Sequence, residues 1–166
     1  MKFMVAILFT LALIAIVIGL VVKGHEWSRN VEGYLKLAAD APNAEKAEQF
    51  IDRALAGIEA RGISSGSSAL IFHNPDADVG VWLGQLRSAK SVLTDLRGRG
   101  AGGLEETNAL MKFRETLLDD EENGTIVTCP PHMSVFPNQA LWAWLLGVSL
   151  VGMLVSWGVA IVTADL

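Results

Sequence analysis

Two long uncharged apolar runs constrain this chain more than any other feature. Residues 3–22 and residues 140–163 contain no charged side chain, and the runs are 20 and 24 residues long. About 20 residues of α-helix suffice to cross the hydrocarbon core of a bilayer, where only a helix or a closed barrel satisfies the backbone polar groups. The sequence therefore predicts an all-α membrane protein with transmembrane helices in residues 1–23 and 140–166.

The first run is predicted to be an uncleaved signal anchor. The apolar stretch of a cleavable signal is about 7–15 residues long and leads to a small-residue cleavage site. This run is longer, and no such site precedes the polar stretch KGHEWSRN. A cleaved secretory signal is the alternative interpretation. The second run is followed by little more than Asp165, so we expect a helix that anchors and packs without carrying an output domain.

The residues between the runs, 24–139, are predicted to form an acidic helical-bundle domain. They carry 11 Lys and Arg against 17 Asp and Glu, a net charge of −6. An acidic surface disfavours binding to nucleic acid and to anionic lipid. The chain has one cysteine, which excludes an intrachain disulfide.

Helical spacing of apolar residues recurs through this domain. The first helix is expected to continue outward to near Asp40, and the pattern predicts three further helices, over residues 43–61, 75–97 and 104–120. Pro130 and Pro131 exclude helix in the stretch that follows, so a short irregular or extended segment is expected before the second transmembrane helix. Four amphipathic helices bury their apolar faces most simply as a bundle.

The cations near the membrane give conflicting indications of orientation. Lys2 lies on the side of the termini, whereas Lys23, Arg29 and Lys36 lie on the side of the domain. Counted literally, they favour a cytoplasmic domain, but the rule applies to loops shorter than about 60 residues. A lysine before an N-terminal apolar run is typical of a signal anchor. We therefore expect an extracytoplasmic domain on a protein of the plasma or inner membrane.

Four aromatic residues are expected at the membrane interface on the side of the domain: Trp27, Phe136, Trp142 and Trp144. Amphipathic rings prefer the headgroup level of a bilayer. Ordinary core packing is the alternative for each ring.

Small residues predict how the two apolar helices pack. Gly152, Ser156 and Ala160 recur every four residues in the second run, and Ala15 and Gly19 have the same spacing in the first. Small residues let membrane helices approach closely. The simplest partner of each helix is the other helix of the same chain, and another subunit is the alternative.

The candidate metal ligands lie in one short segment, Cys129, His132 and Met133. Thiolate, imidazole and thioether suit copper. The spacing is similar to the ligand loop of blue-copper proteins, which implies a copper site, although Met133 directly follows His132 whereas in that family it lies several residues beyond. The alternative is a rigid connector without a metal, and no other cofactor is expected.

The sequence contains no catalytic constellation, so we predict a non-enzymatic protein. The leading hypothesis is an accessory or assembly subunit of a membrane complex, or a homo-oligomer, whose partners are the lipid bilayer and other subunits or copies of itself. The architecture resembles the extracytoplasmic bundles of chemoreceptor and histidine-kinase sensor modules, which implies ligand sensing. An extracytoplasmic protein that senses a ligand or handles copper is therefore the alternative to the leading hypothesis. A pore formed by several copies is the third hypothesis.

Overall fold

The chain folds mostly into helices. The computed structural model describes residues 2–72, 74–100, 103–121 and 124–162. The helices are α1 (Lys2–Trp27), α2 (Gly33–Ala39), α3 (Ala44–Glu59), α4 (Val79–Gly98), α5 (Leu104–Leu117) and α6 (Gln139–Val162), with a π-helical turn η1 (Ser28–Glu32) and a 3₁₀ turn η2 (Pro75–Ala77). The strands are β1 (Leu118–Glu121) and β2 (Gly124–Val127), which pair antiparallel.

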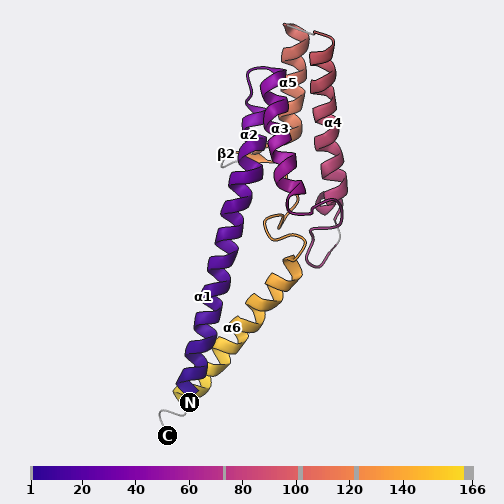
Figure 1. Cartoon of the computed structure of the whole chain (residues 1–166). Helices are drawn as coiled ribbons and strands as arrows, with labels where there is room; N and C mark the ends of the chain where they lie inside the picture. Colours follow the sequence, from indigo (N-terminus) through magenta and orange to yellow (C-terminus); the bar gives the residue numbers. More distant parts are fainter. Residues whose placement is uncertain (1, 73, 101–102, 122–123, 163–166) are drawn as a thin grey trace.

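The first apolar helix continues far beyond its apolar part. Because α1, η1 and α2 join without a break, one helix runs from Phe3 to Ala39. Figure 1 shows it as a single rod whose far end belongs to the bundle. Pro42 disfavours helical backbone in the residue before it, which accounts for the end of the rod. The prediction that this helix continues outward to near Asp40 is confirmed.

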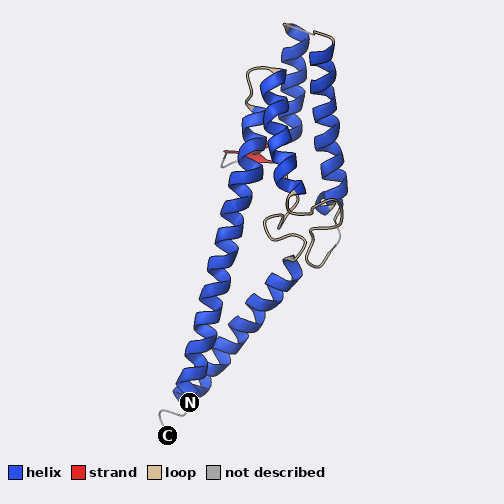
Figure 2. Cartoon of the chain, in the orientation of Figure 1, coloured by secondary structure: helices blue, strands red, loops and turns tan. Residues whose placement is uncertain are grey.

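Four helices form the bundle. Helix α2 packs on α3, α3 on α4, α4 on α5, and α5 again on α2, which closes the ring. Figure 2 shows loops between the helices and, in red, the small hairpin of β1 and β2, which are the named strands among the described residues. Fully buried residues come from every member of the ring, and include Leu35, Ile51, Ile58, Leu83, Leu86, Leu93 and Leu117.

Side-chain caps account for where two bundle helices begin. The side chain of Asn43 accepts a hydrogen bond from the Lys46 N–H at 2.9 Å at the start of α3. The Asp78 carboxylate accepts from the Val81 N–H at 3.0 Å at the start of α4. Each cap satisfies a backbone donor that has no partner inside its helix.

The start of the third predicted helix requires a correction. Residues Pro75–Ala77 form a 3₁₀ turn, and the α-helix begins only at Val79. Asp78 interrupts the two because its backbone is extended, with φ −78° and ψ 106°. Asn74 therefore caps the 3₁₀ turn, and Asp78 caps the α-helix.

The end of the fourth predicted helix is also corrected. Helix α5 ends at Leu117 rather than at Asp120, and residues Leu118–Glu121 pair with Gly124–Val127. Four consecutive acidic residues begin at Asp119. Negative charge is unfavourable at the C-terminal end of a helix. The helix therefore ends before these residues, and the chain pairs instead with the strand that follows in the sequence.

Helices α1 and α6 are long and apolar enough to cross a membrane. Only 6% of the apolar window of α1 and 11% of that of α6 are buried inside the structure. The core helix of a soluble bundle would be mostly buried, so these two do not serve as core helices of the domain. They lie together outside the bundle and converge toward the termini (Figure 1).

We predict that Gly57→Ala destabilises the bundle. Gly57 lies in α3 against the π-helical turn, and a Cβ atom there would stand 2.7 Å from the backbone oxygen of Asn30. Because a backbone oxygen cannot rotate away, α3 must shift, at a cost of about 1–3 kcal/mol. Gly84→Ala is the matched control, since its Cβ meets no atom within 4 Å; we expect it to stabilise the bundle by up to about 1 kcal/mol. Unfolding followed by circular dichroism measures both, and equal shifts would contradict the close packing.

Candidate functional site

The predicted metal ligands line one hollow beside η1. Cys129, His132 and Met133 border a cavity of about 380 Å³ together with Glu32 and Lys36. Met133 is buried in the bundle core, whereas His132 is exposed and has a left-handed backbone conformation, with φ 58°. The structure thus places the three residues around one hollow but gives them very different exposures.

The Cys129 thiol in this hollow is largely buried. Burial, followed by the negative charge of Glu32, raises the pKa of the Cys129 thiol to about 12. A metal binds the thiolate, so binding at Cys129 would have to displace the thiol proton. Across the residues that the structure describes, no three His, Cys, Asp or Glu side chains gather as a potential metal-binding group.

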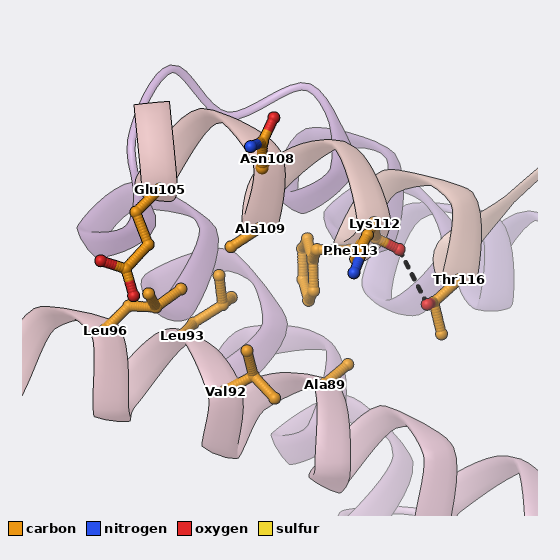
Figure 3. A pocket seen from close by; sticks show the side chains of 10 residues that line it. All are labelled: Ala89, Val92, Leu93, Leu96, Glu105, Asn108, Ala109, Lys112, Phe113 and Thr116. Atoms are coloured by element: carbon orange, nitrogen blue, oxygen red, sulfur yellow. Dashed lines mark hydrogen bonds between the residues drawn. The ribbon is translucent and has the colours of Figure 1, made fainter. Parts of the chain in front are cut away.

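An open apolar groove lies between α4 and α5. It is lined by Ala89, Val92, Leu93 and Leu96 from α4 and by Glu105, Asn108, Ala109, Lys112, Phe113 and Thr116 from α5, and it encloses about 390 Å³. We call this feature the α4–α5 groove (Figure 3). Leu93, Leu96 and Phe113 are buried at its floor, whereas Val92 is 51% exposed on its wall.

The two walls of the α4–α5 groove differ in chemistry. The α4 wall is apolar throughout, because its lining residues recur at the three- and four-residue spacing of one helix face. The α5 wall carries polar side chains along its length, and Figure 3 shows Thr116 bonded to the backbone oxygen of Lys112, at 2.9 Å. Glu105 and Lys112 place opposite charges two turns apart on this wall. An apolar floor with a charged rim suits an amphipathic helix.

The packing of α1 on α6 follows a different spacing from the predicted one. The less exposed positions of α6 include Trp142, Leu146, Ser149, Met153, Ser156 and Ala160, which alternate steps of four and three residues. This is the heptad pattern of helices that cross at a small left-handed angle. The predicted four-residue spacing describes only part of that face.

The predicted small residues have different surroundings. Gly152 receives the ring of Phe9, and Ala160 is buried. Gly19 receives the ring of Trp142, which would stand 3.0 Å from a Cβ atom added to this glycine. Ala15 is exposed, and the fully buried small residue of α1 is Ala6. Ala15 is therefore not buried between α1 and α6.

We predict that Gly152→Leu loosens the contact between α1 and α6. The Phe9 ring occupies the space that a side chain at position 152 would need. Overpacking of this kind costs about 1–3 kcal/mol. Gly158→Leu is the matched control in the same helix, because a Cβ there meets no atom within 4 Å. Thermal unfolding in mild detergent should show a lower midpoint for the first variant only; an equal loss in both would argue against this helix contact.

The four aromatic residues do not form one belt. Trp27 is buried in the bundle core, where it packs on Trp82 with ring centroids 6.4 Å apart, so its predicted interfacial position is wrong. Phe136 packs against the loop at Gly66. Trp142 lies under the Lys23 ammonium, 5.7 Å from its ring centroid, and Trp144 is exposed. The pair of Lys23 and Trp142 joins the loop-side ends of α1 and α6.

Sequence reasoning missed the α4–α5 groove. Val92 lies directly beside the apolar stripe of α4, and Ala89 and Ala109 are too small to fill the space between the two helices. The position of Val92 next to the otherwise complete apolar stripe of α4 was the one sequence feature that could have indicated the groove. Whether neighbouring helices close over such a residue depends on their separation, which the sequence pattern does not contain.

Comparison of the chain with protein-family models, with curated proteins and with solved structures finds no match.

Proposed function

We propose that this chain is a non-enzymatic two-pass membrane protein that serves as an accessory or assembly subunit. In this proposal α1 and α6 cross a bilayer and hold the acidic bundle at its surface. One observation supports the membrane part above all: both helices expose apolar side chains on nearly every face, including Leu8 at 65%, Leu11 at 60% and Leu154 at 60%. Water would make such exposure costly, at about 25 cal/mol per Å² of apolar surface, whereas lipid would not.

The membrane part has a direct biochemical test. We expect the protein to stay in the membrane pellet after carbonate and urea washing, and the mature chain to retain residues 1–23. Recovery of the intact chain in the wash would contradict the spanning helices. A mature N-terminus after residue 23 would show that the first apolar run is a cleaved signal.

We propose that the α4–α5 groove docks an amphipathic helix of another membrane subunit. The apolar lining of α4 runs from Ala89 to Leu96, which is about 10 Å of helix and corresponds to two turns of a partner. The bundle carries a net charge of −6, so a partner helix with basic flanks complements it. A second copy of this chain, itself acidic, fits the groove less well.

We predict that Val92→Lys releases the partner. Val92 is 51% exposed, so the variant should fold while placing a charge inside the docked groove. Val81→Lys is the matched control, since Val81 is 55% exposed on the same helix and lies outside the groove. Native mass spectrometry in mild detergent should show the complex for the parent chain and for the control, and the free subunit for Val92→Lys.

The outcomes of this experiment separate the alternatives. A strict monomer for the parent chain would contradict the docking proposal. A complex that contains only copies of this chain would support a homo-oligomer and contradict docking of a different membrane subunit. An assembly that survives Val92→Lys would show that the α4–α5 groove is not part of the interface.

We further propose that the bundle lies outside the cytoplasm, on a protein of the plasma or inner membrane. Two crossings put both termini on the other side from the bundle. Leu104 is 78% exposed at the start of α5, at the end of the bundle farthest from the apolar helices (Figure 1). A Leu104→Cys variant should react with a membrane-impermeant maleimide in intact cells. Labelling only after the cells are broken would place the bundle in the cytoplasm.

A further inference from the structure

The loop between α3 and α4 exposes a short apolar segment. Leu70, Ile71 and Phe72 are 41%, 80% and 82% exposed. The loop contains no Asp, Glu, Lys or Arg between Arg61 and Asp76. Ile71 and Phe72 are the two most exposed large apolar residues among those that the structure describes, and adjacent exposed apolar side chains of this kind mark contact sites.

The base of this loop is held firmly. Ser68 is fully buried, and its backbone N–H donates to the Ala77 oxygen at 2.9 Å. The Val79 N–H donates to the Gly66 oxygen at 2.9 Å, and the ring of Phe136 packs against Gly66. The loop tip therefore extends from a hydrogen-bonded base that is joined to the start of α4.

The tip lies at the level where the apolar helices leave the bundle. Leu70 lines a hollow together with Leu20 of α1 and with Trp142 and Leu146 of α6. The first residue of α6, Gln139, donates from its side chain to the Ser67 oxygen at 3.2 Å. Figure 1 shows the loop at the end of the bundle that faces α6. The loop thus lies at the same level along the molecule as the bundle-side ends of the apolar parts of α1 and α6.

We propose that the tip formed by Leu70, Ile71 and Phe72 inserts into the interfacial layer of the bilayer, as a third membrane contact beside α1 and α6. This inference rests on the proposed membrane function. Apolar and aromatic side chains gain by entering the boundary between headgroups and acyl chains. The layer is hydrated enough for the loop backbone, which the hydrocarbon core is not. Insertion at this point would fix the tilt of the bundle over the membrane.

Depth-resolved fluorescence quenching tests the insertion. Three single-cysteine chains in a Cys129→Ala background carry an environment-sensitive dye at Phe72→Cys, at Leu104→Cys or at Leu154→Cys. Leu104 is as exposed as Phe72 but lies at the far end of the bundle, and Leu154 is exposed within α6. Each chain is reconstituted into phosphatidylcholine vesicles that contain a nitroxide lipid labelled either near the headgroup or deep in the acyl chain.

We expect blue-shifted emission for the dye at position 72, and quenching by the shallow nitroxide more than by the deep one. The dye at position 104 should show neither effect, and the dye at 154 should be quenched by lipid nitroxides. If position 154 is quenched while position 72 behaves like position 104, the loop inference is overturned and the membrane function stands. If neither is quenched, both fail. A blue shift at position 72 without quenching would indicate a protein contact instead of lipid and would also overturn the inference.

Discussion

Replacing Trp82 by alanine should cost the bundle about 3–5 kcal/mol, the range for deleting a large buried aromatic side chain. Trp82 lies in α4, is 5% exposed, and packs on Trp27 near the end of α1. Its ring N–H donates to the Thr128 oxygen at 2.8 Å. The side chain therefore joins the helix that leaves the bundle, a bundle helix and the segment before α6, and its loss removes all of these contacts together.

Two further variants make the Trp82 prediction specific. Trp82→Phe keeps most of the apolar contact but leaves the Thr128 oxygen without this donor, so we expect a loss of about 1–3 kcal/mol. Trp144→Ala is the matched control, because Trp144 is 73% exposed on α6 and should leave the unfolding of the bundle unchanged. Denaturant unfolding of the detergent-solubilised protein measures the three. A midpoint for Trp82→Ala equal to that of Trp144→Ala would refute the role given to this contact.

Cys129 should react with maleimide about 10³-fold more slowly than an ordinary exposed thiol at pH 8. Burial, and then the charge of Glu32, raises the pKa of this thiol from 9.0 to about 12. Only the thiolate is the nucleophile, and three pKa units lower its population about a thousandfold. An ordinary thiol is fully ionised above its pKa and its rate then levels off. The rate of Cys129 should instead keep rising, about tenfold per pH unit, through pH 9 and 10.

The exposed thiol of Leu104→Cys provides the internal reference for this measurement. In that variant we expect one fast and one slow modification in the folded protein, and two fast ones after denaturation. Mass spectrometry of a labelling time course distinguishes them. Fast labelling of Cys129 in the folded chain, or a rate that levels off near pH 9, would contradict the buried environment.

The sequence by itself determined the features that depend on local chemistry. A helix satisfies its own backbone hydrogen bonds, so the extent of residues 3–22 and 140–163 predicted α1 and α6 directly. The same holds for α3, because Asn43 caps a helix whose apolar face follows a single period and Gly62 after its end has a positive φ of 69°. In each of these elements, side chains within a few residues of one another carry the information.

The tertiary structure alone decided the features that depend on distant neighbours. The strand at Leu118–Glu121 exists because Gly124–Val127 pairs with it, so a helical pattern was misleading there. Trp27 is as suitable for a membrane interface as for a core, and only its contact with Trp82, far away in the sequence, decides between them.

The surfaces proposed for function belong to this second class. The α4–α5 groove depends on the separation of two helices, and the depth of Phe72 depends on how the α3–α4 loop is tied to α6 at Gln139. Local propensity and periodicity report which face of an element is apolar. They do not report which other element that face packs against, because the free energy of burial is gained only when separate elements pack together.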